Sequence, residues 1–201
     1  MRRLVMFNRV TADGYFASED GKLDWVIPDP EVDKLGATGT GEFDTVVLGR
    51  KTYEMFASFW PHIDEHSDTA PNPHDPRKVS KEMKEMGKML NAATKLVFSS
   101  TLRNPTWQNT RILSRLDPVG FAAIKKGPGK DMIMFGSGTI TSQLTEHGLI
   151  DEYQYIVSPI ILGKGKKLID NVSKSVKLEL VDQKSFPTGT QLLKYVPATD
   201  R

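Results

Sequence analysis

Short apolar runs alternate with segments of helical period up to about residue 150 of this 201-residue sequence. The runs lie at 4–7, 45–48, 95–99, 132–135 and 153–162, and each is rich in β-branched or aromatic residues. Runs this short, bounded by Gly, Ser, Asn or charged residues, are typical of strands. Because the first four are almost continuously apolar, we expect them to be buried on both faces, as in the middle of an α/β sheet.

Four segments between these runs have the period of an amphipathic helix. They span 51–60, 79–90, 117–127 and 139–148. The third is the best defined, because Asp117 is a suitable N-cap, Pro118 suits the first helical position and Gly127 closes the helix. Alternation of strand and helix predicts a mostly parallel sheet with helices on both faces.

The last 50 residues contain strand patterns only. Val176, Leu178 and Leu180 alternate with their neighbours in a way that is typical of an antiparallel strand with one buried face. We therefore predict an α/β fold with an antiparallel C-terminal edge, and a single domain over residues 1–201.

The composition excludes several functions. The sequence has no cysteine, which removes thiolate nucleophiles and Cys-ligated metals and fits a reducing cytoplasm. A formal net charge of +2, without a basic stripe, argues against nucleic acid as a partner. Asn8 and Arg9 interrupt the N-terminal apolar run, so it is no signal peptide, and no run approaches the roughly 20 residues that span a bilayer. We expect a cytoplasmic protein without a membrane partner.

Two strand-to-helix junctions carry small and polar residues. The first contains Gly49, Arg50, Lys51 and Thr52, and the second contains Gly136, Ser137, Gly138 and Thr139. Glycine lets a backbone approach a ligand closely, and the start of a helix presents free N–H groups to an anion. Each junction taken alone is also compatible with an ordinary turn.

A third strand end carries hydroxyl groups, at Ser99, Ser100 and Thr101, and alone it too resembles a generic turn. In open α/β sheets, however, ligands bind at the carboxyl ends of the strands. Three such ends together supply more groups than one diphosphate needs. The surplus would suit an additional monophosphate, such as the 2′-phosphate that distinguishes NADP from NAD.

Four stretches, taken in order, resemble the dihydrofolate reductase superfamily, and most closely its bacterial branch related to the reductase domain of riboflavin biosynthesis. They are "VTADGYFA" (10–17), "LGRKTYE" (48–54), "KLVFSSTL" (95–102) and "FGSGTITSQLTEHGLIDEYQYIVSPIILGKGKKL" (135–168). The resemblance implies an eight-stranded mixed sheet, NADPH bound across it, and hydride transfer to a pteridine or pyrimidine. Bifunctional riboflavin enzymes also carry a zinc deaminase that needs cysteines, which this chain lacks.

The resemblance also assigns residues to the cofactor. It places Arg50 and the hydroxyl groups of 99–101 near the 2′-phosphate, and Phe16 with Ala17 in a loop that closes over the nicotinamide. The full set implied to bind NADPH is Phe16, Ala17, Gly49, Arg50, Lys51, Thr52, Ser99, Ser100, Thr101, Phe135, Gly136, Ser137, Gly138, Thr139 and Ile140.

Hydride transfer also requires a proton, and Asp24 and Asp13 are the candidates to supply it, directly or through water. Asp24 is equally suited to a helix cap or an exposed charge. Trp25 and Phe56 are candidates to pack against a flat substrate, although aromatic residues at such positions are more often core.

The polar segment 61–78 contains three histidines, but their spacing matches no compact metal motif, so we predict no metal site. The leading hypothesis is an NADPH-dependent oxidoreductase that acts on a small heterocyclic molecule, as a homodimer formed through the C-terminal strands. The alternative is a non-catalytic nucleotide- or ligand-binding module on the same fold.

Overall fold

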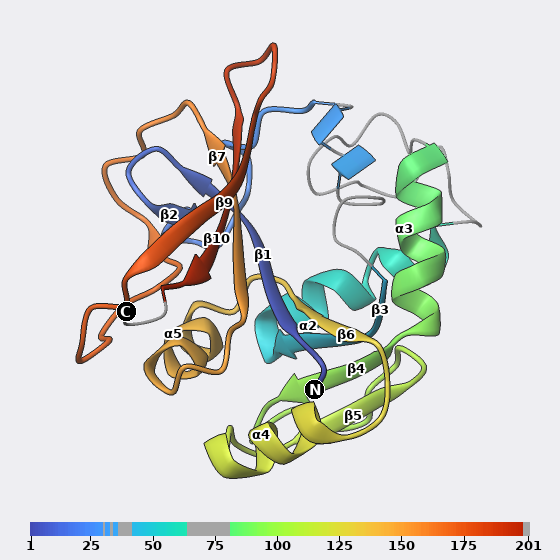
Figure 1. Ribbon diagram of the computed structural model, residues 1–201. Coiled ribbons are helices and arrows are strands. Elements are labelled where there is room, and N and C mark those ends of the chain that lie inside the picture. The colour runs from blue at the N-terminus through green and yellow to red at the C-terminus, as the bar shows by residue number, and fades with distance from the viewer. Residues whose placement is uncertain (30, 33, 36–41, 64–80, 199–201) are drawn as a thin grey trace.

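The computed structural model describes residues 1–29, 31–32, 34–35, 42–63 and 81–198 (Figure 1). Its strands are β1 (Leu4–Thr11), β2 (Tyr15–Ala17), β3 (Phe43–Gly49), β4 (Thr94–Phe98), β5 (Thr110–Leu113), β6 (Asp131–Met134), β7 (Glu152–Ser158), β8 (Lys166–Lys167), β9 (Leu178–Ser185) and β10 (Gln191–Pro197). Its helices are α2 (Arg50–Ala57), η1 (Trp60–His62), α3 (Lys81–Ala92), α4 (Pro118–Lys126) and α5 (Gly138–Glu146).

Eight strands form one sheet in the order β5-β4-β3-β6-β1-β7-β10-β9. The pairs from β5 to β7 are parallel, and β10 pairs antiparallel with both β7 and β9. This arrangement confirms the predicted mixed, mostly parallel sheet with an antiparallel C-terminal edge. A separate antiparallel pair, β2 and β8, lies beside it.

Two apolar clusters cover the two faces of the sheet, because successive side chains of a strand point to opposite faces. On one face, Tyr53 of α2 and Leu90 of α3 pack in a cluster with Phe7 of β1. On the other, Phe121 of α4 and Leu144 of α5 pack in a cluster with Met6. Figure 1 shows α3 and α5 on opposite sides of β1. As predicted, β1, β3, β4 and β6 are mostly buried.

The helix α4 begins and ends as its sequence predicts. The Asp117 carboxylate accepts hydrogen bonds from the backbone N–H groups of Val119 and Gly120, and Gly127 follows the last helical residue. These contacts satisfy backbone donors that the first turn of a helix leaves free.

The outer strand β9 differs from its predicted burial. It pairs antiparallel with β10 as expected, but all of its side chains are exposed, including those of Leu178 and Leu180. The reason is its place at the edge of the sheet, where nothing within the described residues covers the alternating apolar side chains. An uncovered apolar edge of this kind is unusual for an isolated chain.

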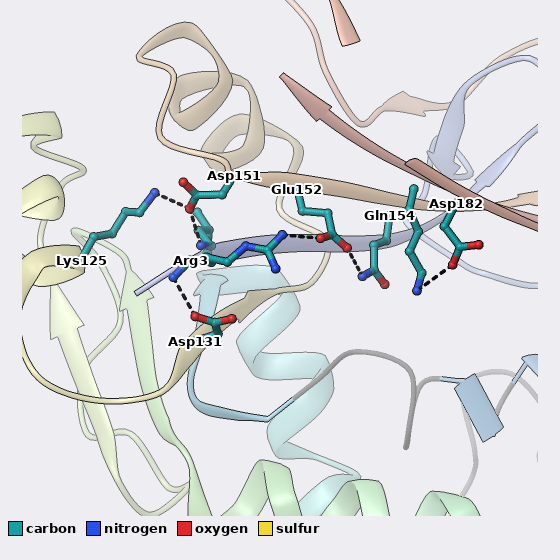
Figure 2. A network of polar contacts seen from close by, with 9 residues as sticks. Arg3, Lys125, Asp131, Asp151, Glu152, Gln154 and Asp182 are labelled. Carbon is teal, nitrogen blue, oxygen red and sulfur yellow. Dashed lines mark hydrogen bonds and ion pairs between the residues drawn. The ribbon is translucent and has the colours of Figure 1, made fainter. Parts of the chain in front are cut away.

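Opposite the carboxyl ends of the parallel strands, polar side chains join β1, α4 and β7 (Figure 2). The Asp151 carboxylate accepts from the Leu4 backbone N–H at 2.6 Å and pairs with the buried Lys125 ammonium at 2.5 Å. Arg3 pairs with Glu152, which also accepts from Gln154. These contacts hold the amino ends of the central strands together, so this end of the sheet stabilises the fold. Within the described residues, no helix is long and apolar enough to cross a membrane.

Candidate functional site

A cavity of about 950 Å³ lies where the carboxyl ends of β1, β3 and β6 meet. Its volume is near the upper end of the roughly 300–1,000 Å³ that is typical of small-molecule sites. Twelve of the fifteen residues predicted to bind the cofactor line it. They are Phe16, Ala17, Gly49, Arg50, Lys51, Thr52, Phe135, Gly136, Ser137, Gly138, Thr139 and Ile140.

The two glycine-containing junctions contact each other directly. The backbone N–H of Gly49 donates to the Ser137 hydroxyl oxygen at 2.6 Å, and that hydroxyl donates to Thr52 Oγ1 at 3.0 Å. The junction after β3 is thereby fixed to the junction after β6. This fixed arrangement presents the starts of α2 and α5 to the same cavity.

The backbone of the second junction takes a special conformation. Gly136 and Ser137 are both left-handed, with φ of 54° and 65°. The buried Asn8 side chain accepts from the Gly136 backbone N–H at 2.5 Å. A Cβ atom at Gly136 would lie 2.7 Å from Thr52 Oγ1. Glycine is therefore required here both by the backbone and by the close approach of the two junctions.

A third close approach occurs at Gly138, where a Cβ atom would lie 2.8 Å from the backbone oxygen of Lys167. The start of α5 consequently packs against β8. This packing brings Lys166 and Lys167 to the cavity, beside the glycines. Lys166 and Lys167 belong to the stretch 135–168 that carries the family resemblance, but neither was predicted to bind the cofactor.

The charges of this end suit an anionic ligand. Arg50, Lys51, Lys166 and Lys167 line it, with Asp20 as an acidic neighbour. Arg50 pairs with Glu54 one turn along α2, at 2.8 and 3.0 Å, and both side chains remain partly exposed. Cations, hydroxyl groups and two helix starts form a donor set that fits the phosphates of a dinucleotide.

The three hydroxyl groups after β4 lie outside the cavity, although neighbouring Phe98 lines it. The Ser99 hydroxyl accepts from the backbone N–H groups of Thr101 and Leu102, so it closes its own turn. Phe98 pairs with Gly49 in the sheet, and the turn therefore leaves the sheet beside Arg50. The role of 99–101 at a 2′-phosphate stays a prediction.

Neither candidate proton donor lines the cavity. The Asp13 carboxylate accepts from the Thr11 hydroxyl at 2.6 Å and from the backbone N–H groups of Leu162 and Gly163. The Thr11 hydrogen bond, with the backbone donors, lowers the pKa of Asp13. These contacts favour Asp13 as an anchor between two loops. Asp24 is exposed, and the Ser18 hydroxyl donates to it at 3.3 Å.

Of the two aromatic candidates for substrate binding, Phe56 lines the cavity and Trp25 does not. Trp25 is buried within the irregular segment that follows β2. The polar segment lies outside the described residues from 64 onwards, and so does the prediction that its histidines at 66 and 74 bind no metal.

Sequence reasoning missed several residues of the cavity. Asn8 and Arg9 come from β1, and Met55, Met83 and Met86 come from α2 and α3. Met83 and Met86 lie in the segment 79–90, whose amphipathic period predicts a helix with one buried face. In the structure both residues pack in the core and also line the cavity. The one sequence signal for Arg9 was that this charged residue interrupts an otherwise apolar run.

Comparison with known proteins gives a family match and a relative. The family described as "RibD C-terminal domain" matches residues 2–192. The uncharacterized protein YyaP of Bacillus subtilis (strain 168) is 29% identical over 199 residues, which cover 96% of this chain and 94% of YyaP.

Solved structures show the same fold at low sequence identity. A putative riboflavin biosynthesis protein from Shewanella sp. PV-4 has a TM-score of 0.72 at 20% identity, with 98% of this chain and 99% of that chain covered. Dihydrofolate reductase from Enterococcus faecalis, complexed with NADP(H) and RAB-propyl, has a TM-score of 0.61 at 15% identity, with 98% and 97% covered. The fold is thus one that reductases use.

Proposed function

Because the chain belongs to the RibD C-terminal domain family, we propose that it is an NADPH-dependent reductase that transfers a hydride to a small heterocyclic, pteridine- or pyrimidine-like substrate. The observation that carries this proposal is the hydrogen-bonded link from Gly49 through Ser137 to Thr52. It gathers two helix starts and the cationic side chains around one cavity, as a dinucleotide requires.

Different residues of the cavity would bind different parts of NADPH. The backbone N–H groups at the starts of α2 and α5, with Thr52 and Thr139, would hold the pyrophosphate, and Arg50 with Lys51 would meet further phosphate charge. When bound, NADPH supplies the hydride. Phe16 and Ala17 of β2 would cover the nicotinamide and exclude water from it.

Calorimetric titration with NADPH and with NADH tests the proposal. We expect NADPH to bind and to raise the melting temperature, since a ligand that binds the folded state stabilises it. Absence of any heat or thermal shift at millimolar NADPH would refute cofactor binding.

A matched pair of variants tests the cofactor preference. If Arg50 meets the 2′-phosphate, then Arg50→Ala weakens NADPH about tenfold or more but leaves NADH nearly unchanged. The control Arg111→Ala removes an exposed arginine of β5 outside the cavity and should change neither affinity. Equal losses for both cofactors in Arg50→Ala would place Arg50 away from the 2′-phosphate.

One observation favours the second candidate, a module that binds a nucleotide without catalysis. Both predicted proton donors lie outside the cavity lining. Asp24 remains our proposal for a proton relay through water, because its carboxylate is exposed. Binding of NADPH without oxidation in the presence of dihydropteridines or aminopyrimidines would support the non-catalytic module.

We also propose that the protein is a cytoplasmic homodimer that associates through the β9 edge. The exposed side chains of Val176, Leu178, Leu180 and Val181 support this proposal, since an apolar edge strand is a suitable surface for a second copy. Light scattering should give a dimer mass, and Leu180→Lys should give a monomer. A wild-type monomer at high micromolar concentration would refute association through this edge.

A further inference from the structure

We infer that the hydride acceptor is an unphosphorylated planar ring, held by aromatic and apolar contacts, and that Arg9 binds one carbonyl or carboxylate oxygen of that ring. The inference rests on the proposed function and names the substrate class of the same site.

The described residues of the cavity separate into two halves of different chemistry. The first half contains the glycines, hydroxyl groups and cations at the starts of α2 and α5 and on β8. The second lies between the sheet face and the helices α2 and α3, and it is lined mainly by Phe7, Phe135, Phe56, Trp60, Met86 and Leu90. A dinucleotide matches the first half, which leaves the second half for the acceptor.

Aromatic rings form a continuous wall across this second half. Phe7 and Phe135 have ring centroids 6.0 Å apart, and Phe135 and Phe56 have centroids 5.4 Å apart. Phe56 then contacts Trp60 at 6.0 Å. Rings at these separations leave faces and edges that stack on another flat ring, and each such contact adds about 0.5–1.5 kcal/mol beyond area burial.

Methionine side chains complete the wall from the helices. Met86 is buried in α3, and Met55 of α2 and Met83 of α3 also line the cavity. A thioether is flexible and polarizable, so methionine adapts to irregular aromatic ligands. A phosphate group against these apolar walls would lose most of its hydration and would have only the Arg9 guanidinium as a charged partner, which is costly.

Arg9 is the one charged side chain among the described residues that line the second half. Its position on β1 follows from strand alternation: Phe7, two residues earlier, belongs to the same face, and Arg9 is in register with Ile156 of that face. A guanidinium beside apolar walls is suited to one oxygen-bearing edge of a ring. Arg9 is therefore the specificity-determining residue for that edge.

The implied reaction balances with the reductant already proposed. A ring carbon of a C=N bond gains the hydride, the neighbouring nitrogen gains a proton from water, and the reduced dinucleotide is oxidised by two electrons in the same step. No charged group of the acceptor takes part in this exchange, so an apolar chamber is compatible with it.

Binding of three probes to the protein saturated with NADP⁺ tests the inference by calorimetry. The probes are pterin, pterin-6-carboxylate and uridine 5′-monophosphate, and saturation prevents the nucleotide from occupying the phosphate-binding half. We expect both pterins to bind at least about tenfold tighter than uridine 5′-monophosphate. Failure of NADP⁺ to saturate the protein would overturn the proposed function itself. With NADP⁺ bound, equal or tighter binding of the phosphorylated probe, or no binding of either pterin, would overturn the inference.

Two substitutions separate the contacts. Phe56→Leu should weaken pterin about fivefold and leave NADP⁺ unchanged. The control Phe186→Leu removes a buried ring outside the cavity lining and should leave pterin binding unchanged. Arg9→Met should abolish any preference for pterin-6-carboxylate over pterin, expected to be at least about tenfold in the wild type. An unchanged preference in a folded Arg9→Met variant would refute the role of Arg9.

Discussion

Lys95 of β4 gives a stability prediction with a definite sign. Its side chain is fully buried, and its ammonium donates to the backbone oxygens of Leu90 and Asn91 at 3.0 and 3.1 Å. The same nitrogen lies 4.4 Å from the Trp107 ring centroid. These contacts fix the C-terminal end of α3. Because Leu90 of α3 lines the cavity, Lys95 stabilises one of the cavity-lining helices.

Burial lowers the pKa of Lys95 from its usual 10.5 to about 8. Between these two values the unfolded chain binds more protons at this group than the folded chain. The free energy of unfolding therefore rises with pH across this window, by about 1.4 kcal/mol per pH unit. From pH 8 to 9.5 the contribution of Lys95 amounts to about 2 kcal/mol.

Urea denaturation of the wild type and of Lys95→Met at pH 6.5, 7.5, 8.5 and 9.5 measures this contribution, because the other titrating groups cancel in the difference. We expect Lys95→Met to be less stable at pH 7, since it leaves two carbonyl groups unsatisfied. The deficit should then grow by about 2 kcal/mol towards pH 9.5. A constant difference across the series would refute the lowered pKa and would mean that the carbonyl groups and the indole ring compensate the desolvation.

Two other predictions concern the glycine junction and the base of the sheet. Gly136→Ala should destabilise the fold by about 2 kcal/mol and weaken NADPH binding, because its Cβ meets Thr52. Gly148→Ala is the control, since it has a similar φ of 61° with nothing within 4 Å, and it should cost only about 1 kcal/mol without affecting NADPH; equal effects in melting and binding assays would contradict the steric argument. Asp151→Asn should cost about 2 kcal/mol in urea denaturation because it leaves the buried Lys125 ammonium without its carboxylate. The pair of the exposed Asp182 with the half-buried Lys194 provides a comparison that should change by less than about 1 kcal/mol in Asp182→Asn.

Local signals in the sequence were sufficient for most of the elements. Helix α4 follows from Asp117, Pro118 and Gly127 because capping depends on residues a few positions apart. The buried central strands were also predictable, because continuous apolarity is a property of neighbouring residues in the chain. The exposed face of β9 was not predictable, since alternation shows that a strand has an apolar face but not what covers it.

The site was predictable only in the parts that repeat a local pattern. Both glycine junctions were identified, but the hydrogen bond between Gly49 and Ser137 joins residues 88 positions apart, and no local pattern reports such a contact. Arg9 was interpreted as an interruption of an apolar run, because its place in the same cavity as Phe135 depends on β6 lying next to β1. Strand order, which is set by the whole chain, decides which side chains share the cavity.

The link between the junctions also has a direction. Hydrogen donation runs from Gly49 to the Ser137 oxygen, and from the Ser137 hydroxyl to Thr52. Each hydroxyl has one hydrogen, so Ser137 has none left for a ligand, whereas the hydrogen of Thr52 is still available to an acceptor in the cavity. Donors arranged in series polarise one another. The backbone of β3 thus strengthens a hydroxyl group three residues further along the chain, and a phosphate bound there would be the final acceptor of the series.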